Sequence, residues 1–173
     1  MRYVLASFLS FVLALPLAAH ARSIDHPTWH SARWPKNTVS FDALGMGLGV
    51  FGIEYERAVA ERISLYGSPR YLDRRIDGLH AEGFGLDAGA RFFVSGQAPE
   101  GLFLSPAVGL YLPTAGDRLL GWTATALVGH TWLIDRSFDI SLGFGAVLYD
   151  LKEDGRERRA IMPTGRISIG AAF

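Results

Sequence analysis

The stretch from Phe138 to Leu148, FDISLGFGAVL, decides the fold class of this chain. Its even-numbered positions are all apolar, whereas its odd-numbered positions carry Asp, Ser, Gly, Gly and Val. Successive side chains of a β-strand point to opposite faces, so the pattern predicts a strand with one apolar face and one face of small or charged groups. Repeated strands of this kind behind an export signal are typical of transmembrane β-barrels.

Seven further segments show the same alternation. The eight predicted strands are Asn37–Met46, Leu48–Val59, Ile63–Tyr71, Ala81–Val94, Leu102–Leu112, Leu119–Ile134, Phe138–Leu151 and Arg159–Phe173. Bacterial single-chain barrels have an even number of strands, and eight is the smallest common size. The predicted fold is therefore all-β, an eight-stranded antiparallel up-and-down transmembrane β-barrel.

The connections between these strands alternate in length. Those after the second, fourth and sixth strands are short, whereas Arg70–His80 and Lys152–Arg158 form longer, charged loops after the third and seventh. The connection after the first strand is predicted to be only a Gly-rich turn near Gly47. Short periplasmic turns and longer external loops are expected when both termini lie in the periplasm.

The N-terminal segment is predicted to be a targeting signal. Met1-Arg2 is positive, residues 3–17 are mostly apolar, and Ala19-His20-Ala21 fits a cleavage site, so residues 1–21 are a predicted signal peptide. The domain organisation then places a periplasmic lead-in at residues 22–35 and the outer-membrane barrel of a Gram-negative bacterium at residues 36–173. An uncleaved anchor helix is the alternative, but the apolar run is shorter than the ~20 residues that span a bilayer.

Composition excludes several function classes. Lys+Arg and Asp+Glu are equal at 17 each, which argues against a nucleic-acid partner, because phosphate-binding proteins carry a basic face. The chain has no cysteine, so no disulfide stabilises it. Gly143-x-Gly145 and the glycines at 45, 47 and 49 lie within predicted strands with no following helix, so they are not nucleotide loops, and we expect no cofactor.

The inward faces of the predicted strands collect charged side chains. These are Asp42, Glu54, Glu56, Asp87, Arg91, Asp139 and Arg166. The interior of an eight-stranded barrel is only wide enough for side chains, and unpaired charges there carry a large desolvation cost. We therefore expect a plug of salt bridges. A narrow proton or ion path is the alternative, and nothing else in the chain supports Glu54 and Glu56 as a catalytic carboxylate pair.

Two tryptophans on the sixth predicted strand indicate how far that strand extends across the membrane. Trp122 and Trp132 are ten residues apart and share the outward face, and ten tilted residues rise about 25 Å, the height of the apolar band between aromatic girdles. Both are predicted membrane-interface aromatics. A sixteen-residue helix or a soluble β-sandwich fits this region less well, because the opposite strand faces carry charges and glycines.

The last strand resembles the C-terminal assembly signal of Gram-negative outer-membrane barrels. Ile167, Ile169 and the terminal Phe173 share one face, and the resemblance implies recognition by the barrel-assembly machinery. A longer stretch is similar to a family of small outer-membrane barrels of unknown function, distantly like the OmpA and OmpX type. The matching residues are Lys36–Ser40, Ile53–Ala58, Gly89–Phe93 and Ala98–Phe103. The family commonly has a tyrosine near His130, so it implies no role for this histidine.

Three weaker patterns remain. Some eight-stranded outer-membrane barrels are enzymes that modify lipid A through a wall-facing His, Ser and acid, but Trp132 stands where the serine would follow His130. His80 with Asp77 and Glu82 is a weak metal pattern, and we expect no metal site. Lys152, Arg156, Arg158 and Arg159 would suit lipopolysaccharide phosphates. We expect a non-enzymatic membrane scaffold with no catalytic residues. The alternatives are an outer-membrane lipid-modifying enzyme (lipid A deacylase-like) and a narrow channel. The sequence assigns no oligomeric state to the protein.

Overall fold

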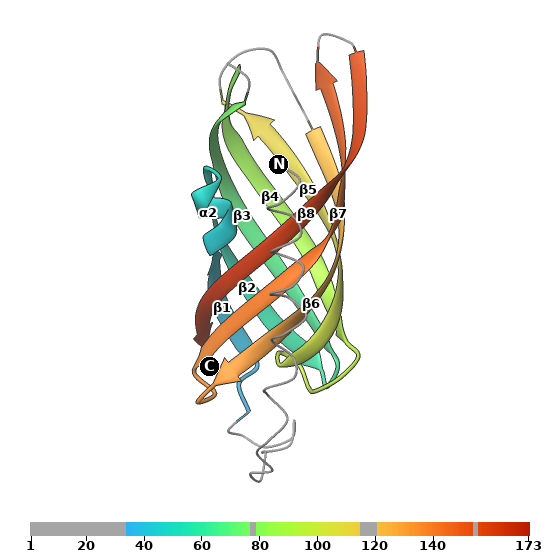
Figure 1. Ribbon diagram of the computed structural model, residues 1–173. Coiled ribbons are helices and arrows are strands. Elements are labelled where there is room, and N and C mark those ends of the chain that lie inside the picture. The colour runs from blue at the N-terminus through green and yellow to red at the C-terminus, as the bar shows by residue number, and fades with distance from the viewer. Residues whose placement is uncertain (1–33, 77–78, 115–120, 154–155) are drawn as a thin grey trace, which may run out of the picture.

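The chain forms a closed barrel of eight antiparallel strands joined in sequence order (Figure 1). The computed structural model describes residues 34–76, 79–114, 121–153 and 156–173. The strands are β1 (Asn37–Asp42), β2 (Val50–Ala60), β3 (Ile63–Ile76), β4 (Leu79–Phe93), β5 (Gly101–Pro113), β6 (Gly121–Ile134), β7 (Phe138–Glu153) and β8 (Arg156–Ala172). The expected all-β class, strand number and order are confirmed.

The alternation of side chains is also confirmed. On β2 the apolar Phe51, Ile53 and Tyr55 are exposed, whereas Glu54 and Glu56, at alternate positions, are buried. Leu65 on β3 and Phe84 on β4 follow the same rule as outward residues. The wall therefore presents apolar side chains outward and polar side chains to the lumen, which is the reverse of a soluble domain.

The barrel closes between its first and last strands. Thr38 pairs with Ala172 and Asp42 with Ser168, and the Phe173 backbone oxygen accepts hydrogen bonds from the Lys36 and Asn37 amides at 3.1 and 2.9 Å. The predicted pairing of the first segment with Arg166–Phe173 is therefore confirmed. We call this the Phe173 end of the barrel, and the other end, which carries the β3–β4 and β7–β8 hairpins, the hairpin end (Figure 1).

The first strand is shorter than the sequence pattern suggests. β1 stops at Asp42, and the short helix α2 (Ala43–Gly47) follows in place of strand residues up to Met46. Asp42 accepts a hydrogen bond from the Gly45 amide at 3.0 Å and so caps the helix. The expected simple glycine turn near Gly47 is therefore wrong, because the aspartate cap favours a helical turn first.

The two expected long loops are also wrong. β3 and β4 remain paired up to Ile76 and Leu79, and β7 and β8 up to Glu153 and Arg156. Most of Arg70–His80 and Lys152–Arg158 therefore belongs to paired strands. Backbone hydrogen bonding across a hairpin does not require alternation of apolar side chains. A charged stretch can therefore belong to paired strands even though its sequence does not predict a strand.

A small apolar cluster is buried near the Phe173 end of the barrel. Ala58, Phe93, Ala98 and Phe103 are buried together, and the two phenylalanine rings meet edge to face with centroids 5.9 Å apart. Trp34 donates its indole N–H to the Ala98 carbonyl at 2.8 Å, which ties the end of the lead-in to this cluster. No helix within the described residues is long and apolar enough to cross a bilayer.

Candidate functional site

The centre of the lumen holds a network of buried ion pairs organised around Arg91. This arginine comes from β4, is 2% exposed, and donates to Glu54 at 2.7 Å and to Glu56 from its other terminal nitrogen. Both glutamates come from β2, and they are two residues apart, so strand alternation places them on the same inward face. A single guanidinium therefore bridges two carboxylates in a fork geometry.

Arg166 extends the network from β8. Its guanidinium pairs with the second carboxylate oxygen of Glu54, so this glutamate lies between two arginines. Ser64 on β3 donates its hydroxyl to Glu56. The consecutive strands β2, β3 and β4 and the last strand, β8, thus contribute to one network, and the closure of the barrel brings β8 to it.

Aromatic rings and glycines complete the packing of these charges. The Arg91 guanidinium lies 4.9 Å from the Phe103 ring centroid and 5.2 Å from that of Tyr66, distances that favour cation–π attraction. A Cβ at Gly89 would lie 2.6 Å from the Tyr66 ring, so the absence of a side chain there makes room for the tyrosine. The inward Gly89 thus accommodates a bulky lumen side chain.

Asp139 is the third buried carboxylate of the network region. It lies on β7 and is 2% exposed, and its Oδ1 atom makes no hydrogen bond within the described part of the chain. It lies over Gly170, where its Oδ1 would be 2.6 Å from an added Cβ. The central lumen therefore contains three carboxylates and two guanidiniums. Arg91 and Arg166 attract all three carboxylates, either by direct ion pairing or by longer-range electrostatic attraction.

The other two predicted lumen charges lie apart from this network. Asp87 pairs with Arg70 at 2.7 Å in a more open part of the lumen, where both side chains are partly exposed. Asp42 caps α2 and is a correction to the predicted cluster, since its carboxylate is used by the helix. Arg70 was missed because it was assigned to the charged connection Arg70–His80, although its position two residues after the inward Ser68 was the available signal.

One buried acid lies on the outer side of the wall. Asp150 is 2% exposed although its register partner on β6, Trp122, is exposed, and it accepts a hydrogen bond from the Arg159 side chain at 2.7 Å. The sequence pattern identified Arg159 only as part of a basic cluster. A carboxylate at an outward position thus becomes buried because the arginine on the neighbouring strand covers it.

The predicted outward residues occupy the outer face. Trp122 on β6 is exposed, and the Trp132 ring lies against His130 with centroids 4.5 Å apart. His130 pairs in register with Leu102 and Leu142, so neither neighbouring strand places a serine or an acid directly beside it. Phe173 is 63% exposed and continues the outward row of Ile167 and Ile169.

Two predicted surface patterns fall partly outside what the structure describes. Of the weak metal pattern, Asp77 lies outside the described residues. Within the residues that are described, no three His, Cys, Asp or Glu side chains gather closely enough to hold a metal ion. Comparison of the chain with protein-family models, curated proteins and solved structures finds no match.

Proposed function

We propose that this protein is an outer-membrane β-barrel whose filled lumen makes it a non-enzymatic scaffold, and that it displays the β3–β4 and β7–β8 hairpins at the cell surface. The supporting observation is the inverted polarity of the wall. The ion pairs of Arg91 are buried inside, whereas residues such as Ile53 (61% exposed) face outward. An apolar outer face of this extent is stable where the surrounding medium is hydrocarbon.

Strand length supports the display of the hairpins. β3, β4, β7 and β8 contain 14, 15, 16 and 17 residues. A tilted strand needs only about 9–11 residues to cross the hydrocarbon core. The excess extends the two hairpins beyond the membrane on the side opposite the Phe173 end.

Targeting and assembly follow from the two ends of the chain. Residues 1–21 would act as a cleaved signal peptide, and Ile167, Ile169 and Phe173 would be recognised by the barrel-assembly machinery. The basic sequence at the start of β8, near the hairpin end, would favour contact with lipopolysaccharide phosphates.

The filled lumen favours a scaffold over a channel. Arg91 pairs with Glu54 and Glu56 inside the lumen, Arg166 of β8 also pairs with Glu54, and the Phe103 ring lies 4.9 Å from the Arg91 guanidinium. An ion would have to displace paired charges to pass, at a large desolvation cost. Purified protein in planar bilayers is therefore expected to give no regular conductance steps.

The first test asks whether the protein is a membrane barrel. Outer-membrane fractions are run on gels with and without boiling, and the unboiled protein is expected to migrate differently. A protein that is recovered in the soluble periplasmic fraction, with migration independent of boiling, would contradict the proposal.

The second test examines display and enzymatic activity in intact cells. An epitope inserted between Ile76 and Leu79 is expected to bind antibody on whole cells, whereas the same epitope at the Glu61–Arg62 turn is not. Mass spectrometry of lipid A from cells with and without the gene is expected to give identical profiles. A changed acylation pattern that reverts with wild-type protein but not with His130→Ala would instead support a lipid-modifying enzyme.

A further inference from the structure

One buried carboxylate of the central lumen has no cation paired with it. Glu54 pairs with both Arg91 and Arg166, and Glu56 pairs with Arg91. None of these ion pairs includes Asp139, which is 2% exposed and whose Oδ1 atom makes no hydrogen bond to any described residue. Three carboxylates therefore meet two guanidiniums, and one negative charge in this part of the lumen is not balanced.

Asp139 lies in the same cross-strand row as Glu54. Asp139 of β7 pairs in register with Gly170 of β8. Gly170 pairs with Ser40 of β1, which in turn pairs with Glu54 of β2. Because Gly170 has no side chain, the Asp139 carboxylate can lie over it, with Oδ1 2.6 Å from the position of an added Cβ. The next acid along this row is therefore another carboxylate, and a nearby like charge disfavours ionisation of Asp139.

The charged groups on the surrounding strands do not pair with Asp139. β4 and β8 contribute Arg91 and Arg166, whose ion pairs are made with the glutamates of β2. β1 contributes Asp42, a further carboxylate, which caps α2. The surrounding strands thus bring two shared cations and additional negative charge.

The remaining neighbour of β7 is β6, and it brings no charge into the lumen beside Asp139. Asp139 is the second residue of β7, directly after the tight turn from β6 at the Phe173 end. Its register partner on β6 is the apolar Leu133. Asp135 and Arg136 in the turn are exposed, where solvent and salt weaken their effect on a buried group.

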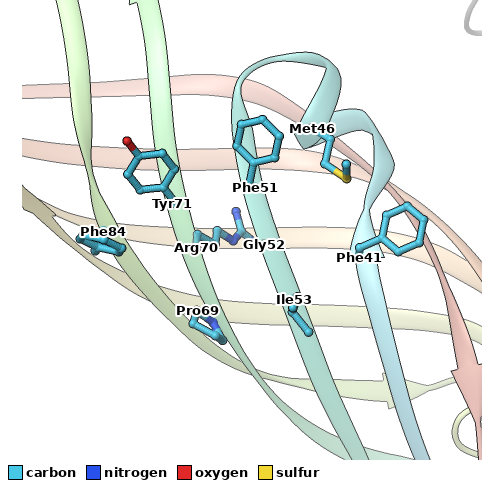
Figure 2. Close-up of a pocket in the computed structure, with 9 residues that line it drawn as sticks. All are labelled: Phe41, Met46, Phe51, Gly52, Ile53, Pro69, Arg70, Tyr71 and Phe84. Carbon is cyan, nitrogen blue, oxygen red and sulfur yellow. The ribbon is translucent and has the colours of Figure 1, made fainter.

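Arg70 serves a different part of the lumen. It pairs with Asp87 at 2.7 Å, and its register partner on β2 is Gly52. Figure 2 shows Arg70 beside Gly52, among the residues that line a pocket near α2. The pair of Arg70 and Asp87 is neutral as a whole, so it leaves the charge imbalance around Asp139 unchanged.

Uncharged hydroxyl groups lie near the row that contains Asp139. Thr38 Oγ1 and Ser168 Oγ are buried and make no hydrogen bond within the part of the chain that the structure describes. Thr38 is two residues from Ser40 and Ser168 is two residues from Gly170, so all four positions face the lumen. A hydroxyl oxygen can accept a hydrogen bond from a protonated carboxyl group. Binding a metal ion would require several ligands, whereas binding a proton requires one carboxylate.

We propose that Asp139 is a proton-binding site of the lumen. An ionised carboxylate that is buried without a paired cation carries a large desolvation cost, which the group avoids by binding a proton. With Asp139 protonated, the two glutamates balance Arg91 and Arg166, and the central lumen becomes neutral. This inference goes beyond the scaffold role proposed above, because it gives the barrel a group that responds to acid.

Infrared spectroscopy of the refolded full barrel tests the assignment, because a protonated carboxyl group has a carbonyl band that an ionised carboxylate lacks. Exposed carboxylates are largely ionised above about pH 5.5. Wild type is expected to keep one such band at that pH, and ¹³C-labelling of aspartate, but not of glutamate, is expected to shift it. Asp139→Asn is expected to lose the band. Asp87→Asn, which changes an inward aspartate that is paired with Arg70, is expected to keep it.

Urea unfolding at several pH values provides a second measurement. If the folded barrel binds a proton that the unfolded chain releases, its stability falls as the pH rises. Above about pH 4 an aspartate in the unfolded chain is mostly ionised. From there until the folded site loses its proton, the unfolding equilibrium constant of wild type is expected to rise relative to that of Asp139→Asn, by up to about tenfold per pH unit for one proton.

Several outcomes would overturn the proposal. These are a wild-type spectrum without the band, a band that shifts with labelled glutamate, and a band that survives in Asp139→Asn. Stability that depends on sodium concentration in a barrel without the band would assign the balancing charge to a metal cation instead. Heat-modifiable migration shows whether each variant is folded. If Asp139→Asn does not refold, the labelled wild-type and Asp87→Asn spectra decide the question.

Discussion

Neighbouring residues of β2 point to opposite faces of the barrel wall and have different surroundings. Ile53 is largely exposed on the outer face, whereas the next residue, Glu54, is buried between two arginines. A soluble protein would bury the isoleucine and expose the glutamate. The comparison shows that charges pair with one another in the lumen, whereas the outer face presents apolar side chains. If that face meets the membrane proposed above, each face should respond to a different kind of substitution.

The largest expected effect comes from the lumen. Arg91→Leu leaves Glu56 buried without its cation, and removal of one partner of a buried ion pair costs about 3–5 kcal/mol in the free energy of unfolding. Urea titration of the refolded barrel in vesicles measures this loss. Combining Arg91→Leu with Glu56→Leu is expected to recover part of it, because an uncompensated carboxylate is then removed.

An exposed arginine provides the control for that substitution. Arg57 lies on the outward face of β2 and bonds Asn37 at 3.3 Å. Arg57→Leu is expected to change stability by no more than about 1 kcal/mol. If Arg57→Leu and Arg91→Leu had equal effects, burial of the ion pairs would not be what distinguishes the two faces.

The outer face should respond to charge. Phe144 projects outward near the middle of β7, and Phe144→Arg is expected to cost about 2–4 kcal/mol in a bilayer, because the arginine must enter hydrocarbon. The same urea titration measures it. Unchanged stability in vesicles would show that this face meets water, and it would contradict the proposal that the outer face contacts hydrocarbon.

A smaller effect is expected at the closing seam. Gly170 lies between β1 and β7, and an added Cβ would overlap the Val39 carbonyl oxygen, so Gly170→Ala should cost about 1–3 kcal/mol through overpacking. Gly143 on the neighbouring β7 is the control, because the nearest atom to its added Cβ is 3.7 Å away. Thermal unfolding followed by loss of gel mobility shift should separate the two variants; equal transition temperatures would contradict tight packing at the seam.

The smallest effect on stability is expected at the chain end. The Phe173 side chain is exposed, and its structural contacts are made by the backbone, so Phe173→Ala should change the free energy of unfolding by about 0.5 kcal/mol or less. Assembly in cells is expected to fall much further if the side chain is an assembly signal. Comparison of refolded yield in vitro with membrane-inserted protein in cells measures both, and normal insertion would contradict the resemblance at this end.

The outward and inward faces of the strands were predictable because strand alternation is a local property. Leu65, Phe84 and Val108 lie outside, and Ser64 and Arg91 lie inside, as a period of two requires. Strand number and order followed for the same reason, since turn residues such as Asp135-Arg136-Ser137 separate apolar alternations. Asp135 and Arg136 indeed adopt positive φ in the tight turn between β6 and β7.

Strand ends were less predictable. Charged residues between Arg70 and His80 suggested a loop, but cross-strand backbone pairing continues through them. Conversely, apolar residues after Asp42 suggested a continuing strand, but the aspartate caps a helical turn instead. Backbone pairing across the hairpin decides the first case, and a single side-chain cap decides the second; apolar alternation indicates neither.

The sequence by itself determined where the strands lie and which side chains share a face, apolar on one and small or charged on the other, because strand alternation depends only on neighbours two residues away. The tertiary structure alone decided which charges meet. Arg91 pairs with Glu54 and Glu56, Arg166 reaches Glu54 from the far end of the chain, and Asp42 is diverted to cap α2. These partners depend on the register and closure of all eight strands, which are set by contacts between residues as far apart as Thr38 and Ala172.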